Sequence, residues 1–147
     1  GNVPVSEVRI SMQGNWQKLH WNALVSAYER SPYFEYYADS FRPFYEERWE
    51  RLADFNAAMR ETVLRLLGIK VEVRRTTEYV RDFPGEDCRA LISPKTPLAD
   101  DRRFRQQPYW QVFRHKYGFV PGLSIADLLF NMGPESRIIL RDSLRSE

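Results

Sequence analysis

A long amphipathic helix is the feature that most constrains how this chain can fold. After Pro43, large apolar side chains recur at spacings of three and four residues, the period of an α-helix with one buried face. They are Tyr45, Trp49, Leu52, Phe55, Met59, Val63 and either Leu66 or Leu67. Gly68 follows them, and glycine accepts at little cost the left-handed conformation that ends a helix. The pattern predicts one helix over about residues 44–67.

The segments around this helix predict a helix-dominated α/β domain with a small sheet. Residues 16–29 have the same apolar spacing, and Asn15 is a candidate N-cap whose side chain would accept a hydrogen bond from the first turn. A shorter helix is expected between Pro32 and Pro43. Alternating apolar residues predict strands at 3–11 and 70–74, and a parallel partner is expected for the second strand.

A long irregular segment separates these elements from the last third of the chain. Prolines and a Pro-Gly pair break every period between residues 78 and 110. We therefore expect residues 80–108 to form an irregular loop, the most mobile part of the chain. A total of 147 residues fits a single domain, residues 1–147.

Composition excludes several classes of protein. Twenty-one aromatic residues (nine Phe, eight Tyr and four Trp) supply enough apolar area for a sizeable core. The near balance of 22 basic and 20 acidic residues is neutral on nucleic acid, but the sequence has only a local basic cluster and no strong basic stripe, so nucleic acid is not an expected partner. Cys88 is the single cysteine, so the chain lacks the pattern of a disulfide-bonded protein. No apolar run approaches the roughly 20 residues of a membrane span. We therefore expect a cytoplasmic protein. No metal-ligand spacing or dinucleotide motif is present, so neither a metal nor any cofactor is assigned.

Two segments in the first two-thirds of the chain are candidates for binding. Residues 15–37 begin with Asn15 and Trp16 and are rich in rings. Packing is the favoured interpretation of these rings, and an aromatic wall for a sugar or a base, with His20 as its polar group, is the alternative. In the irregular segment, Lys95 follows a Pro-fixed turn and is either a phosphate contact or a solvated lysine.

The third candidate segment runs from Tyr109 and Gln111 to residue 136. Ser124 is a plausible N-cap for a short helix beginning there, and the free N–H groups of a helix start can also bind an anion. Asp127 could return a hydrogen bond to this cap or turn toward a cleft, and we slightly favour capping. Asn131 lies four residues later, on the same face of the helix.

Taken together, these blocks resemble the WbqC-like family of bacterial proteins over about residues 5–142. The resemblance rests on the order and spacing of residues 15–34, the end of the helix at 67–69, the Ile92-Ser93-Pro94-Lys95 stretch, and the 109–113 and 123–136 segments. It implies a role in O-antigen or other surface-polysaccharide synthesis and the transfer of glycine or a similar acyl group to a sugar. Members usually begin with a further segment, so the chain resembles the C-terminal two-thirds of a member.

Three functions remain open at this point. The first is a transferase acting on a sugar or nucleotide-sugar, with Asp127 and His20 as catalytic residues. The expected substrate-binding residues are Lys95, Asn15, Trp16, Tyr109, Gln111, Ser124 and Asn131. The second is a non-catalytic accessory protein that binds a glycan-synthesis enzyme, and the third is a nucleotidyl-transfer enzyme. Convergence of Lys95, His20 and Asp127 in one cleft would favour an enzyme. The sequence does not indicate the oligomeric state.

Overall fold

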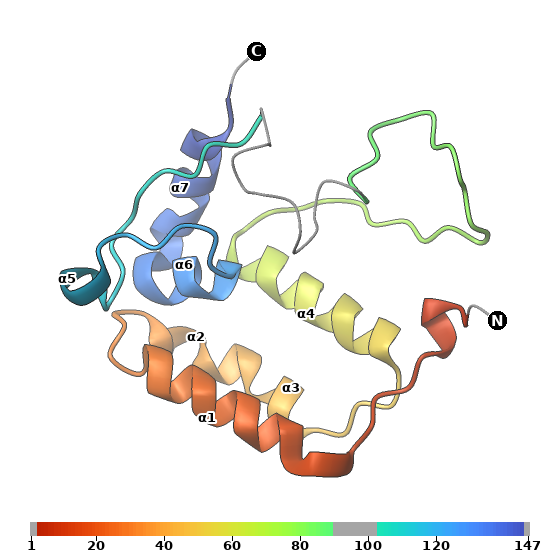
Figure 1. Cartoon of the computed structure of the whole chain (residues 1–147), viewed down its shortest axis with the longest axis horizontal. Helices are drawn as coiled ribbons and strands as arrows, with labels where there is room; N and C mark the ends of the chain where they lie inside the picture. The colour runs from red at the N-terminus through yellow and green to blue at the C-terminus, as the bar shows by residue number, and fades with distance from the viewer. Residues whose placement is uncertain (1–2, 90–102, 146–147) are drawn as a thin grey trace.

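The computed structural model describes residues 3–89 and 103–145, which form helices joined by irregular segments (Figure 1). The α-helices are α1 (Trp16–Tyr28), α2 (Phe34–Phe41), α3 (Pro43–Glu46), α4 (Leu52–Leu66), α5 (Arg114–Tyr117), α6 (Ile125–Met132) and α7 (Ser136–Ser143). Single 3-10 turns lie at Val5–Glu7, Gln13–Asn15 and Gly133–Glu135. Within the described residues, no helix is both long and apolar enough to cross a membrane.

The core forms where α6 packs against α2 and the end of α1. Phe130 of α6 is fully buried, and its ring lies 5.1 Å from those of Tyr28 and Phe34 and 5.3 Å from that of Phe41, between centroids. Tilted and edge-on ring pairs of this kind each contribute roughly 0.5–1.5 kcal/mol beyond their buried area. Rings from α1 and α2 therefore pack around Phe130, and these contacts hold α6 against both helices.

The predicted α/β class is wrong, because residues 3–89 and 103–145 contain no β-strand. The expected strand at 3–11 makes only one antiparallel bridge, between Arg9 and Arg51. The expected strand at 70–74 is irregular, and Val71 and Val73 in it are 57% and 45% exposed. An alternating segment becomes a strand only where a neighbouring strand accepts its hydrogen bonds, and no described segment lies beside this one as a strand.

The predicted continuous helix at 44–67 is also wrong in one respect, since residues 47–51 separate α3 from α4. Gln17 of α1 donates hydrogen bonds to the carbonyls of Phe44 and Glu47, at 3.1 and 2.6 Å, and thereby satisfies the end of α3. Beyond that end, the carbonyl of Glu50 accepts a hydrogen bond from the N–H of Ile10 at 2.9 Å. Contacts with distant segments thus replace the hydrogen bonds that would have continued the helix.

The predicted helix ends have mixed outcomes. Gly68 follows α4 with a φ of +65°, as expected, and Ser124 caps α6 by accepting a hydrogen bond from the N–H of Ala126 at 3.3 Å. Asn15 does border α1, but its side chain makes no capping hydrogen bond. Its φ of +53° lies in the left-handed region, whereas a side-chain N-cap requires an extended backbone.

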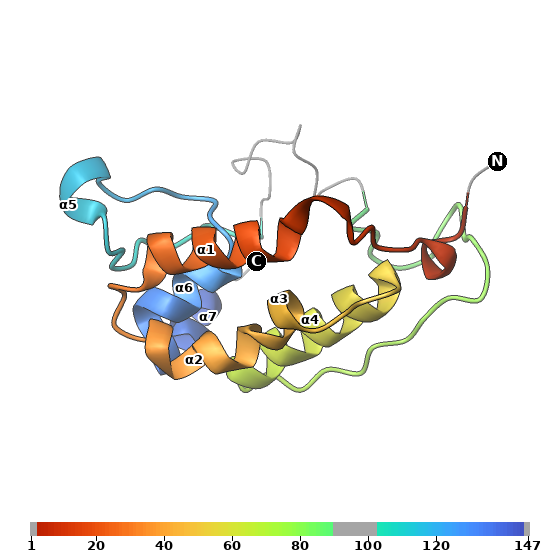
Figure 2. The same ribbon diagram turned by 90° about the horizontal axis from the view of Figure 1, so that it is seen from below.

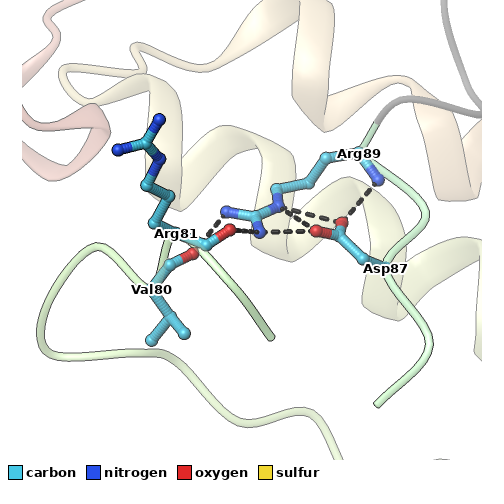
Figure 3. Close-up of polar contacts among 4 residues, drawn as sticks. All are labelled: Val80, Arg81, Asp87 and Arg89. Carbon is cyan, nitrogen blue, oxygen red and sulfur yellow. Dashed lines mark hydrogen bonds and ion pairs between the residues drawn. The ribbon is translucent and has the colours of Figure 1, made fainter. Parts of the chain in front are cut away.

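Residues 69–89 leave α4 as an irregular excursion away from the helices (Figures 1 and 2). Near its end, the Arg89 guanidinium donates hydrogen bonds to the Asp87 carboxylate and to the carbonyls of Val80 and Arg81 (Figure 3). These bonds close a local loop. The described parts of the predicted 80–108 loop contain no helix or strand, as expected, while its remaining residues, 90–102, lie outside the described ranges. The mobility of this loop stays a prediction.

Candidate functional site

A buried carboxylate on α6 lies at the centre of the candidate site. Asp127 is only 4% exposed, and its Oδ2 atom accepts hydrogen bonds from the Tyr109 hydroxyl at 2.6 Å and from Gln111 Nε2 at 3.0 Å. Burying a carboxylate is costly unless donors replace the water that it loses. The side chain is therefore turned toward the 109–111 segment and not back to the Ser124 cap, so the favoured expectation of capping by Asp127 is wrong.

Two tyrosine hydroxyls near this carboxylate keep their protons at neutral pH. Burial raises the pKa of Tyr109 above its usual range, and the hydrogen bond to Asp127 raises it further. Burial also raises the pKa of Tyr28, at the end of α1, with a further contribution from the negative charge of Asp127. Tyr109 is consequently a fixed donor, and Asp127 is the acceptor.

Two side-chain amides hold the loop around Asp127. Gln111 donates to the carbonyl of Val120 and accepts from its N–H, both at 2.9 Å. Asn131 accepts from the N–H of Val112 at 3.0 Å and donates to the Asp127 carbonyl at 2.8 Å. Both amides were expected to contact substrate, but these groups bond to the protein itself. They position the 112–120 loop across α6.

A small apolar hollow opens between this loop and α6. Its volume is about 160 Å³, room for roughly five water molecules. Its walls are Gln111, Val112, Phe113, Tyr117, Gly118, Val120, Leu123 and Asp127. The hollow is therefore large enough for a small acyl group or part of a sugar ring, and a buried carboxylate forms part of its wall. We call it the Asp127 hollow.

The structure does not bring His20 to Asp127. His20 is exposed on α1, and its ring centroid lies 5.4 Å from that of Trp16. Tyr28, the α1 residue beside Asp127, is eight residues further along, which is about 12 Å at 1.5 Å per residue. Lys95 lies outside the described residues, so its expected place in a cleft is not observed.

Of the remaining predicted site residues, Asn15 and Trp16 are on or before α1, and Ser124 lines an adjoining cavity of about 300 Å³ together with Tyr109 and Leu123. Asn15 is exposed before α1. Trp16 donates its indole N–H to the carbonyl of Ser11 at 2.9 Å, and its ring lies 6.0 Å from that of Phe55. Ser124 is exposed at the start of α6, where it caps the helix. Contacts within the protein therefore account for the positions of Trp16 and Ser124.

The rings of residues 15–37 are mostly packed, which is the interpretation that the sequence favoured. Trp21 lies 6.2 Å from Phe34 and 5.7 Å from Tyr45, between ring centroids. The Arg42 guanidinium covers the Trp21 ring at 5.5 Å. Tyr36, which is 85% exposed, is an exception. These contacts place Trp21 within the packing of the helices and not in an open aromatic wall.

Sequence reasoning missed a second cavity, which lies against Tyr109. It has a volume of about 350 Å³ and is lined by Pro108, Tyr109, Trp110, Arg114, Gly118 and Phe119. A charge signal was available in the sequence, because residues 103–126 contain four Arg or Lys residues and no Asp or Glu. We call this second cavity the basic cleft.

Comparison with known proteins assigns the family. The sequence profile of the WbqC-like protein family matches residues 1–95, about two-thirds of the chain. The chain belongs to the WbqC-like protein family. It is also similar to the uncharacterized protein Rv1507c of Mycobacterium tuberculosis (strain ATCC 25618 / H37Rv), with 28% identity over 155 aligned positions. That alignment covers 86% of this chain and 65% of the relative, and no solved structure matches.

The matched part of this WbqC-like chain contains none of the residues that line the Asp127 hollow or the basic cleft. The profile covers α1 to α4 and ends at residue 95, before Tyr109 and Asp127. Cys88 lies inside the match and is exposed. In the described part of the chain, no cluster of three or more His, Cys, Asp or Glu residues could hold a metal ion.

Proposed function

We propose that this WbqC-like chain acts in bacterial surface-polysaccharide synthesis, O-antigen included, by transferring glycine or a similar small acyl group to a sugar. Family membership supplies the setting. The observation that carries the proposal is the placement of Asp127, a buried carboxylate, in the wall of an otherwise largely apolar hollow. A carboxylate in such surroundings is a common general base, and the volume of the hollow suits a small acyl group.

In this proposal, Asp127 takes the proton from a sugar hydroxyl. The hydroxyl oxygen then attacks the carbonyl carbon of an activated acyl donor, a thioester or an aminoacyl ester, and forms the new ester bond. The bond between that carbon and the donor's leaving group breaks, and the leaving group departs with the proton. Tyr109 and Gln111 orient Asp127 through their bonds to its Oδ2 atom. His20 has no role in this step, because it lies toward the other end of α1.

An acylation assay tests the proposal. The chain is incubated with glycyl thioester and nucleotide-linked sugars, and the acylated sugar is detected by its mass. Asp127→Asn keeps the shape of the side chain and removes the base, so the rate should fall about 100-fold or more. Asp142→Asn, an exposed carboxylate on α7, is the matched control and should keep the parent rate. Absence of product with the parent, or equal rates in parent and Asp127→Asn, would reject the proposal.

A second candidate, the accessory protein that binds a glycan-synthesis enzyme, is favoured by the 69–89 excursion. Val71, Val73, Tyr79 and Phe83 in it are all between 45% and 82% exposed. Large exposed apolar side chains on one segment are typical of protein contacts. If this candidate is correct, replacing Val71, Val73 and Phe83 by Ser should abolish co-purification with the enzyme while the parent and the Asp127→Asn variant retain it.

A further inference from the structure

The basic cleft lies beside the Asp127 hollow, because Gly118 lines both cavities and Tyr109 in the wall of the cleft bonds to Asp127 in the wall of the hollow. The Tyr109 ring lines the cleft, while its hydroxyl donates to Asp127 at 2.6 Å. Phe119 packs edge-on against this ring, with centroids 5.2 Å apart. Trp110 is 38% exposed in the same wall, so part of its surface is open to a ligand. A molecule seated in the cleft would therefore contact aromatic rings and lie close to the carboxylate.

The cleft has one cationic side chain in its wall, Arg114. Arg114 lines it, is exposed, and forms no ion pair with any carboxylate of the described residues. His115 and Lys116 follow it on α5, and no Asp or Glu occurs anywhere in residues 103–126. Because nothing acidic in its own segment neutralises Arg114, its guanidinium is available to an anion.

We infer that the basic cleft binds the phosphate-bearing end of a sugar substrate, so that the sugar enters linked to a nucleoside diphosphate. A base stacks on Trp110, since base–aromatic stacking is favourable for any base. The Arg114 guanidinium donates paired hydrogen bonds to a phosphate, a geometry that its planar fork matches. The inference rests on the proposed function for the sugar end of the ligand, which would reach Asp127 past Tyr109.

Calorimetric titration of the whole chain separates the contributions of ring and charge. The probes are uridine diphosphate, glucose 1-phosphate, uridine and inorganic phosphate. Uridine diphosphate carries both ring and phosphate and should bind at least about tenfold more tightly than uridine or phosphate alone. If glucose 1-phosphate binds as tightly as uridine diphosphate, the inference that the cleft recognises a nucleoside is rejected. Equal affinity for uridine and its diphosphate, or no binding of either phosphorylated probe at millimolar concentration, would reject the whole inference.

Two charge-removing variants on α5 locate the contact. Arg114→Gln should weaken binding of uridine diphosphate about tenfold or more, the effect of losing hydrogen bonds to a charged group. Lys116→Gln removes the same charge two residues away, but its side chain does not line the cleft. It should change the affinity less than about twofold at 0.15 M salt, where screening is effective beyond about 8 Å. Equal losses of affinity in both variants would mean that the positive charge of α5 attracts the anion non-specifically, and would reject the cleft as the binding site.

The aromatic contact is tested at Trp110, which is partly exposed and not central to the core. Trp110→Ala should weaken binding of uridine diphosphate but leave inorganic phosphate unchanged, while Trp110→Phe should restore most of the affinity. Circular dichroism and melting temperature verify that each variant is folded. If uridine diphosphate binds in a manner that depends on Arg114 but the chain shows no acylation activity, the proposed function is rejected and this inference stands. If the chain acylates unphosphorylated sugars and Arg114→Gln does not change the rate, the proposed function stands and this inference is rejected.

Discussion

The Tyr109 hydroxyl donates a 2.6 Å hydrogen bond to the carboxylate of Asp127, and both side chains are more than 90% buried. Eighteen residues separate them, so the bond joins the start of the 109–122 segment to α6. Gln111 bonds to the same oxygen and also to Val120. This small set of contacts determines the shape of the Asp127 hollow and one wall of the basic cleft.

Tyr109→Phe should destabilise the protein although it keeps the ring. It leaves the buried Asp127 carboxylate with one hydrogen bond fewer, and a bond to a charged group contributes about 1.5–3 kcal/mol. Urea unfolding measures the loss of free energy. Tyr36→Phe, at a position that is 85% exposed, is the matched control and should stay within about 0.5 kcal/mol of the parent. Equal effects of the two changes would contradict the prediction.

Gln111→Leu should release the 112–120 loop. The Val120 N–H loses its acceptor, so its amide exchange should become much faster, because protection depends on the hydrogen bond and on burial. Hydrogen exchange followed by NMR measures this. The Leu67 N–H, bonded to the Val63 carbonyl at the end of α4, is the internal control and should keep its protection. Unchanged exchange at Val120 would show that other contacts hold the loop.

Gly133→Ala should be much more destabilising than Gly118→Ala. Both glycines have positive φ, +54° and +68°, so both variants bear a backbone cost of about 1–3 kcal/mol. A Cβ at Gly133 would also lie 2.5 Å from the Tyr33 ring, whereas a Cβ at Gly118 has nothing within 4 Å. The extra crowding should add about 1–3 kcal/mol in thermal or urea unfolding. Similar losses for the two variants would mean that Tyr33 moves aside freely.

The Asp87 carboxyl should titrate at low pH. Hydrogen bonds from Arg89 lower its pKa from the ordinary 3.8 to about 2. Because the folded-state pKa is lowered, the contribution of this pair to stability is present above about pH 4 and is lost as the pH falls toward 2. NMR titration of the carboxyl carbon should give a midpoint near 2 in the parent and close to the ordinary value in Arg89→Gln.

Arg81→Gln is the control for that titration. Arg81 meets Arg89 only through its backbone carbonyl, so the substitution should leave the Asp87 midpoint unchanged. The Arg89 and Asp87 side chains are 48% and 36% exposed, so high salt should weaken the interaction between them. A parent midpoint near 3.8 would show that the Arg89 bonds in Figure 3 do not persist in solution.

The sequence by itself determined the helices and helix ends that depend only on residues close together in the chain. Helix α1 lies where apolar spacing predicted it, Gly68 follows α4, and Ser124 caps α6. Each of these depends on residues within about one helical turn, through side-chain periodicity, a permitted φ or a hydroxyl near free N–H groups. The packing of the Trp21 ring was also foreseeable, because rings at helical spacing bury large areas.

Only the tertiary structure decided the features that depend on distant partners. Ile10 bonds to Glu50 across 40 residues, and α3 and α4 are separate beside that contact. The 70–74 segment has a strand pattern but no described strand to pair with. The sequence slightly favoured capping by Asp127, but in the fold its carboxylate accepts a hydrogen bond from the hydroxyl of Tyr109, eighteen residues earlier in the chain. A buried carboxylate takes the orientation that supplies it with donors, and the fold determines where those donors lie.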